Sequence, residues 1–291
     1  MRKVLIGLRS QFPNECAVLQ RKIALLYDQK GLLETAVNEY TVLADNFAGQ
    51  DDGGEGLWRR AYCDYQLCRH DDAETCLQLV FRYHSNRPIA EQAVRLYMDV
   101  LTHRTAWDRT VTYCTGVAGD SNKSDSLRAH ALTLTGVASC ERGEVSTGMH
   151  NLDQCIAGYP DNADLALFYK CLYLLRQNRR EEAFQTQREL AAKNPALAFL
   201  ILGFDAKSRN RLTEAFGWHK KACDAARAAK DVGAEADALL YMWDIQTIAD
   251  DFAGAEKTKR ELAMHAPAQF RNFFRMTDSE FAQYLQQPVG K

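Results

Sequence analysis

Residues 18–47 place apolar side chains at the spacing of one α-helix face, and a glycine divides the pattern in two. The first half carries Ala24 and Tyr27 on its apolar face. Gly31 then interrupts the periodicity, as glycine does in turns between helices. The second half carries Ala36, Tyr40, Leu43 and Ala44. This pattern predicts two amphipathic helices that pack as a hairpin around small residues.

The same order of small and aromatic residues recurs along the chain. The small residue of each second helix serves as a marker, and successive markers are 37, 37, 38, 35, 32 and 40 residues apart. The markers are Ala36, Ala73, Thr110, Gly148, Ala183, Ala215 and Ala255. The matching first-helix positions are Ala24, Ala61, Gly136, Cys171 and Gly203, with Met98 and Trp243 in the third and seventh units. A repeat of this length predicts a stack of helix hairpins.

The small–aromatic–glycine–small–aromatic order resembles the tetratricopeptide repeat (TPR) family, whose period is about 34 residues. Prolines recur where we expect second helices to end, at Pro13, Pro160, Pro195 and Pro267. The resemblance covers about residues 14–270 and implies an all-α, right-handed α-solenoid of about seven TPR-like hairpins. We expect residues 1–13 to form the second helix of a partial repeat or an N-terminal cap, and residues 271–291 to form a C-terminal capping helix and tail.

Two segments outside the repeat pattern carry their own signals. Thr277 or Asp278 is a suitable N-cap for a short helix to residue 286, in which Phe281 and Leu285 share one face. We expect this helix to cover the open edge of the last repeat. Phe270, Phe273 and Phe274 just before it form either a plug for the terminal core or a docking patch.

Residues 49–56 are acidic and rich in glycine, which predicts a flexible connection between repeats. A calcium loop is excluded because the oxygen ligands do not fall at the alternating positions that such a loop requires.

Composition and motifs exclude several classes of function. The net charge of −2 gives no basic excess for general nucleic-acid binding, and the longest apolar run, residues 196–204, is too short to span a bilayer. The sequence has no phosphate-binding loop, zinc-protease motif or nucleophile elbow, and its 7 histidines are scattered. We therefore predict a protein that is not an enzyme, with no cofactor and no metal.

The 9 cysteines are irregularly spaced and lie mostly within apolar helix faces. This usage predicts buried, reduced thiols and a cytoplasmic location. The alternatives are the periplasm or envelope, if an upstream leader was removed, or the cytosolic face of a membrane complex.

In a TPR-like stack the first helices line the concave face, so this face is where we expect a partner to bind. The candidate binding residues are Arg21, Trp58, Tyr62, Tyr65, Arg95 and Asp99. Aromatic side chains beside arginine are typical binding hot spots, although Trp58 and Tyr62 could equally belong to the core. The apolar first helices of the fifth and sixth units are either buried or a partner surface; their residues are Leu165, Phe168, Leu172, Leu197, Leu200 and Phe204.

The resulting prediction is a non-catalytic scaffold or adaptor, a subunit of a larger complex that binds a protein or peptide in the concave groove. The TPR subtype that clamps chaperone carboxylate tails is excluded, because Asp99 would repel a carboxylate. One alternative is an envelope or membrane-protein assembly factor. The helix ends at residues 12–14 and 159–162 are similar to those of periplasmic TPR proteins, and residues 8–13 are similar to a stretch of the TPR subunit of the endoplasmic-reticulum membrane protein complex. An RNA-binding helical repeat is disfavoured by the acidic balance.

Overall fold

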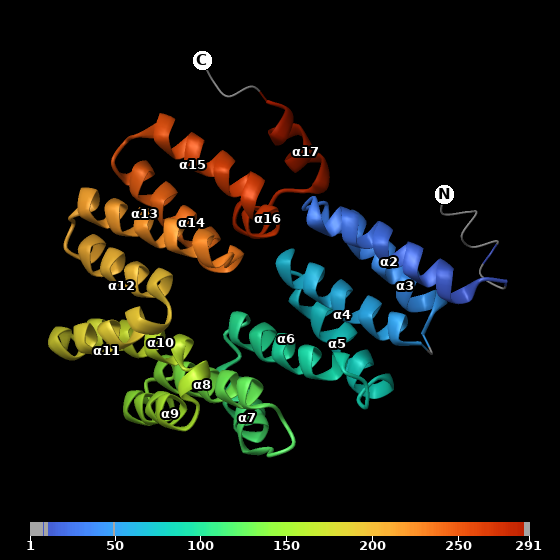
Figure 1. Cartoon of the computed structure of the whole chain (residues 1–291), viewed down its shortest axis with the longest axis horizontal. Helices are drawn as coiled ribbons and strands as arrows, with labels where there is room; N and C mark the ends of the chain where they lie inside the picture. The colour runs from blue at the N-terminus through green and yellow to red at the C-terminus, as the bar shows by residue number, and fades with distance from the viewer. Residues whose placement is uncertain (1–7, 9–10, 49, 288–291) are drawn as a thin grey trace. The chain divides into compact units, whose positions relative to one another are not determined.

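The computed structural model describes residues 8, 11–48 and 50–287, and within these residues all regular secondary structure is helical (Figure 1). The helix predicted over residues 1–13 falls mainly outside the described residues. The chain forms two compact units. Unit 1 combines Met1–Val100 with Pro267–Lys291, and unit 2 is Leu101–Ala266.

In each unit, consecutive helices form pairs that are joined by short turns. Unit 1 contains α2 (Pro13–Gln29), α3 (Leu33–Asn46), α4 (Asp51–Gln66), α5 (His70–Tyr83), α16 (Pro267–Phe274) and α17 (Asp278–Gln286). Unit 2 contains α7 (Trp107–Gly119), α8 (Asp125–Glu141), α9 (Val145–Gly158), the 3-10 turn η1 (Pro160–Asn162), α10 (Asp164–Arg176), α11 (Arg180–Lys193), α12 (Pro195–Ser208), α13 (Leu212–Ala229), α14 (Val232–Ile248) and α15 (Phe252–His265). Helix α6 (Ile89–His103) leads from unit 1 into unit 2.

The turn between the first and second helix of every predicted hairpin contains one residue with left-handed backbone. These residues have φ between 52° and 88° and each lies five positions before a marker; they are Gly31, Cys68, Thr105, Gly143, Asn178, Asn210 and Asp250. In each turn the following amide donates to the carbonyl five residues back, as Leu32 N does to Tyr27 O at 2.9 Å. This is the Schellman arrangement that satisfies the last carbonyls of a helix. The repeat spacing found in the sequence is therefore the spacing of these turns.

The small marker residues allow paired helices to approach closely. Ala36, Ala73 and Ala183 have no exposed surface, and a Cβ at Gly148 would lie 2.6 Å from the carbonyl oxygen of Gly136. The predicted role of these positions in helix packing is confirmed.

The glycine-rich segment differs from the prediction. Residues 51–56 form the first turns of α4, and Gly53, Gly54 and Gly56 are buried. A Cβ would lie 2.3 Å from the carbonyl oxygen of Phe47 at Gly53, and 2.9 Å from the amide nitrogen of Ala44 at Gly56. These glycines let α4 approach the end of α3, so the prediction of a flexible connection was wrong.

The recurring prolines also act differently from the prediction. They begin the next element instead of ending the second helix, because a helix leaves its first amides unpaired and proline has none to lose. Pro13, Pro195 and Pro267 start α2, α12 and α16, and Pro160 starts η1.

The C-terminal helices pack against the first repeat, 240 residues earlier in the chain, as the red and blue helices of Figure 1 show. Thr277 caps α17 in a capping box with Glu280, so the structure selects Thr277 from the two N-caps that the sequence predicted. Phe281 and Tyr284 are buried; the Tyr284 ring stacks on Phe270, and the Phe281 ring is tilted against it. We expected Leu285 to share the buried face with Phe281, but it is 47% exposed. The residue that packs against α16 beside Phe281 is Tyr284, three positions later.

Two helices of unit 1 cap each other at this junction. Helix α3 has no side-chain cap of its own, and the Asp278 carboxylate accepts from the amides of Glu34 at 3.2 Å and Thr35 at 2.9 Å. In return, the Glu34 carboxylate accepts from the Asp278 amide at 3.0 Å, at the start of α17. Each carboxylate thus meets the positive end of the other helix.

Arg271 completes the junction from within. Its side chain is fully buried, it pairs with the Asp278 carboxylate, and it donates to the carbonyl oxygens of Gly31 at 2.6 Å and Met276 at 2.7 Å. A buried guanidinium requires this complete set of acceptors, since an unpaired charge in this position would be strongly destabilising.

In unit 2, His219 takes the place that leucine or tyrosine occupies in three of the other repeats. It follows the marker Ala215 by four positions, as Tyr40 follows Ala36 and Leu152 follows Gly148. It is fully buried against Gly203, stacks on Tyr241 with ring centroids 5.2 Å apart, and neither ring nitrogen has a hydrogen-bond partner. Burial lowers its pKa from 6.5 to about 4, so it is neutral at pH 7.

Replacing Arg271 with Met should selectively loosen unit 1. Loss of the guanidinium leaves Asp278 and two carbonyls without their buried partner, which should lower the free energy of unfolding by about 3 kcal/mol. Amide hydrogen exchange by mass spectrometry should accelerate in α3 and α17. Arg275→Met is the matched control, since Arg275 is an exposed arginine of the same turn. Unchanged exchange in α3 of the Arg271 variant would contradict the role given to this junction.

His219 should make unit 2 less stable in acid. The unfolded chain takes up a proton near pH 6.5 and the folded chain near pH 4, so stability is complete above the upper value and falls through this window. The loss should reach about 3 kcal/mol at pH 4. In His219→Leu, chemical unfolding followed between pH 7 and pH 4 should lack this component, whereas exposed His150→Gln should retain it. Parallel pH curves for the wild type and His219→Leu would contradict the assignment.

Candidate functional site

The first helices of unit 1 present a stripe of polar and aromatic side chains. On α4, Glu55, Trp58, Tyr62 and Tyr65 follow one another at steps of three and four residues, so they lie along one face. On α6, Gln92, Arg95 and Asp99 are spaced in the same way. All six candidate binding residues that were predicted from the sequence belong to unit 1.

Trp58 and Tyr62 form the aromatic centre of this face. Their rings are stacked with centroids 6.1 Å apart, and the Arg59 guanidinium lies 5.3 Å from the Trp58 ring centroid. Both aromatic rings are half-buried and pack against the core formed by α4, α5 and α6. Each ring therefore supports the core with one part and meets solvent with the other.

A polar network between α2, α3 and α4 holds this aromatic pair in place. Arg59 donates to the Glu55 carboxylate at 2.6 Å and lies 3.8 Å from the Asp28 carboxylate. The Tyr40 hydroxyl donates to the same Asp28 carboxylate at 3.3 Å. Burial raises the pKa of Asp28, and burial followed by the nearby Asp28 charge raises that of Tyr62. The network positions the Arg59 guanidinium beside the Trp58 ring.

A hollow of about 210 Å³ opens at the N-terminal end of α4, one turn before Trp58, between α2, α4 and α6. Its rim is charged: Arg21 lies 3.5 Å from Asp52, and Arg87 lies 2.8 Å from Asp51. Its lining residues are Arg21, Asp51, Asp52, Glu55, Arg87, Pro88, Ile89 and Gln92. Three acids and two bases line the hollow, and each acid pairs with an arginine, Glu55 with Arg59 outside the hollow.

The structure brings some nominated residues together and leaves others apart. Arg21 lies in the hollow, and Glu55 connects the hollow through Arg59 to Trp58 and Tyr62. Tyr65 lies farther along α4, where its ring centroid is 5.9 Å from that of His70. Arg95 and Asp99 continue the α6 face beyond Gln92.

Sequence reasoning missed the acidic rim of the hollow. Asp51, Asp52 and Glu55 lie in the segment interpreted as a flexible connection, although two consecutive acids are also typical of the first turn of a helix. The apolar first helices of the fifth and sixth units contribute to the unit 2 core, where Phe168, Leu172, Leu197 and Phe204 pack around Cys171 and Ile201.

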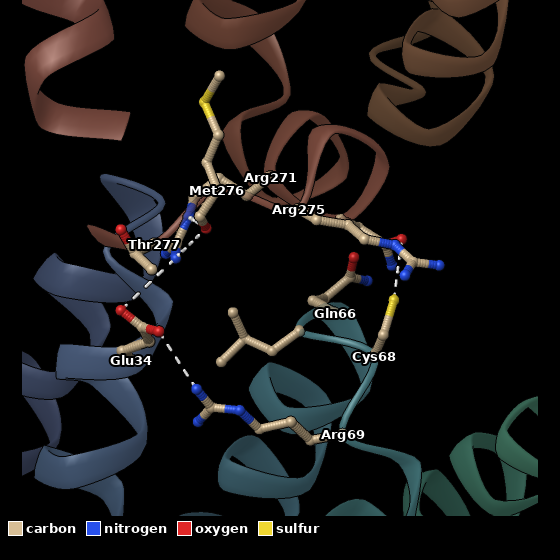
Figure 2. A pocket seen from close by; sticks show the side chains of 10 residues that line it. Glu34, Gln66, Cys68, Arg69, Arg271, Arg275, Met276 and Thr277 are labelled. Atoms are coloured by element: carbon tan, nitrogen blue, oxygen red, sulfur yellow. Dashed lines mark hydrogen bonds and ion pairs between the residues drawn. The ribbon is translucent and has the colours of Figure 1, made fainter. Parts of the chain in front are cut away.

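A second hollow of about 210 Å³ lies where the end of α4 meets α16 (Figure 2). Its polar side chains mostly engage one another: Arg69 lies 3.2 Å from Glu34, and the Cys68 thiol lies 3.5 Å from the Asn272 side-chain oxygen. Arg271 is saturated by its buried acceptors. This hollow belongs to the contact between α4 and the C-terminal helices, and its polar groups are less available to a partner than those of the first hollow.

The described residues offer few candidates for metal ligands or reactive side chains. No group of three His, Cys, Asp or Glu side chains among the described residues is placed to hold a metal ion. Eight of the nine cysteines are buried and Cys68 is exposed. No helix in the described part of the chain has the length and apolar character to cross a membrane.

Comparison with known proteins identifies the architecture. No protein-family model matches the sequence, and no curated protein matches it in a sequence search. A solved Rap protein in complex with competence and sporulation factor is similar in structure with a TM-score of 0.53 and 13% identity, over 94% of this chain and 81% of that one. The C-terminal part of a TPR repeat-containing protein from Cytophaga hutchinsonii gives 0.47 and 13%, over 91% and 99% of the two chains, and the type IV pilus biogenesis factor PilW gives 0.42 and 15%, over 93% and 99%. The repeated left-handed turns, the buried small markers and the likeness to the Rap structure lead to one conclusion: this chain is an all-α, TPR-like helical-repeat protein.

Proposed function

We propose that this chain is a non-catalytic interaction scaffold that binds a protein or peptide partner on the first-helix face of unit 1. The observation that carries the proposal is the hollow between α2, α4 and α6, continued along α4 by the stacked Trp58 and Tyr62. Half-buried aromatic residues beside a hollow with a charged rim suit the anchoring of a partner. The Rap protein of similar fold was solved with competence and sporulation factor, which is in keeping with this role.

The chemistry of the face favours an amphipathic peptide or helix. An apolar side chain would enter the hollow over Ile89 and Pro88, and a lysine or arginine next to it would meet Asp51, Asp52 and Glu55. The ion pairs on the rim cost little to open, because the Arg21 and Arg87 side chains are 44% and 45% exposed. A partner can therefore replace them with its own charges.

We also infer that the protein acts in a reducing compartment, the cytoplasm, as a subunit of a larger complex. None of the nine cysteines, all of which lie in the described part of the chain, forms a disulfide, and eight are buried. Burial raises the thiol pKa of Cys76, Cys140 and Cys223 to about 11 and that of Cys171 to about 12, so these thiols are unreactive in the folded chain.

Changing Trp58→Ala together with Arg95→Ala should weaken partner binding at least tenfold, because truncating an aromatic anchor removes about 2 kcal/mol of binding free energy. The measurement is capture of partners by the tagged chain from its own cells, quantified by mass spectrometry. Gln78→Ala with Arg82→Ala on the exposed face of α5 is the control and should retain the partners. Circular dichroism separates the outcomes: if the first pair melts the helices, these side chains are core and the proposed face is wrong.

Thiol titration should find one reactive cysteine in the native protein and nine after denaturation. Cys68 is the exposed thiol, and the other eight are shielded by packing. The protein should be isolated from its own cells without reductant and with rapid alkylation. Fewer than about seven free thiols in the denatured sample would contradict the cytoplasmic assignment.

A further inference from the structure

Helix α2 carries an apolar stripe on the flank that faces away from α4. Phe12 is 50% exposed, Leu19 47% and Leu26 56%. Leu19 and Leu26 are seven residues apart, close to two helical turns, so they line up along the helix, and Phe12 precedes it as the N-cap residue. Glu15 and Lys22 are exposed beside them.

The stripe is distinct from the face proposed for partner binding. Arg21 and Asp28 lie about 200° and 180° around the helix from Leu19, at 100° per residue. These two residues make the contacts of α2 with α4, to Asp52 at 3.5 Å and to Arg59 at 3.8 Å. The stripe is therefore the outer stacking edge of the first repeat, and covering it leaves the hollow accessible.

The exposed apolar edge of α2 calls for a cover. Here three large apolar side chains are about half exposed along the edge, whereas soluble monomers avoid extended patches of this kind.

The stripes of two copies of α2 are complementary to each other when the two helices run antiparallel. If two copies of α2 cross about Leu19, Phe12 of each copy meets Leu26 of the other, and the two Leu19 side chains meet at the centre. Glu15 precedes Leu19 by four residues and Lys22 follows it by three, so Glu15 of one copy lies within about 1.5 Å, along the axis, of Lys22 of the other. A two-fold axis places both members of each ion pair on the same side of the seam. Apolar layers flanked by opposite charges at matching heights are the pattern of a specific helix pair.

We propose that a second copy of this chain docks on the α2 stripe, antiparallel and two-fold symmetric, with Glu15 of each copy paired to Lys22 of the other. The contact is isologous, because the same patch serves both copies. One helix from each side gives an interface at the small end of the range for specific complexes, so the dimer dissociates in the micromolar range, on the order of 10 μM.

Sedimentation velocity of the full chain from 1 to 200 μM tests the proposal. The wild type should pass from monomer to dimer over this range, and Leu19→Asp should remain a monomer throughout, a loss of affinity of at least 100-fold. Phe252→Asp is the control, since Phe252 is an exposed apolar residue of α15 in unit 2, and it should dimerise like the wild type.

Charge reversal tests the orientation. Glu15→Lys and Lys22→Glu should each weaken the dimer about tenfold by placing like charges opposite each other, and the double variant should recover wild-type affinity. These exposed changes should leave the thermal midpoint of the monomer unaltered. The proposal is overturned if the wild type is monomeric at 200 μM, if Leu19→Asp still dimerises, or if the double reversal fails to recover affinity. It is equally overturned if Leu19→Asp destabilises a monomeric wild type, since another part of the same chain would then cover the stripe.

Discussion

The close approach of paired helices, set by one left-handed turn per hairpin, is the constraint on which the rest of the structure depends. The turn residue lies five positions before the small marker of the second helix, as Gly31 does before Ala36. Because this offset is constant, every second helix begins in the same phase and buries the same face. Non-glycine residues such as Cys68 and Thr105 accept the left-handed conformation at a cost of about 1 kcal/mol each, since the alternative is unsatisfied carbonyls at the end of the first helix.

A second constraint acts at the junction of the C-terminal helices with α3 and α4. Asp278 and Glu34 each cap the other's helix, and Arg271 neutralises the acidic charge from within the packing. Interactions between residues 240 positions apart cost more chain entropy to form than those within a hairpin. The buried arginine and its complete set of acceptors are therefore what make unit 1 a single body built from both ends of the described chain.

The candidate binding face follows from helical spacing. Steps of three and four residues bring Glu55, Trp58 and Tyr62 onto one side of α4, and the network of Asp28, Tyr40 and Arg59 holds a guanidinium beside the Trp58 ring. The outer flank of α2 is free of these constraints, because it meets neither α3 nor α4. The two faces can therefore serve different contacts without competing.

The sequence by itself determined the local features. It gave the period of the hairpins, the small markers and the Thr277 cap, because each depends on residues within a few positions of one another. Only the tertiary structure decided the rest. Whether Gly53 and Gly56 form a linker or a packing surface depends on how near the end of α3 lies, and composition alone cannot distinguish the two. Whether Tyr284 or Leu285 is buried beside Phe281 depends on the surface of α16. The contact of Asp278 with α3 joins segments that are remote in the chain. The hollow beside Arg21 likewise exists only where three helices meet. Local periodicity fixes which face of a helix is apolar, whereas the identity of the neighbour that covers it is a property of the folded chain.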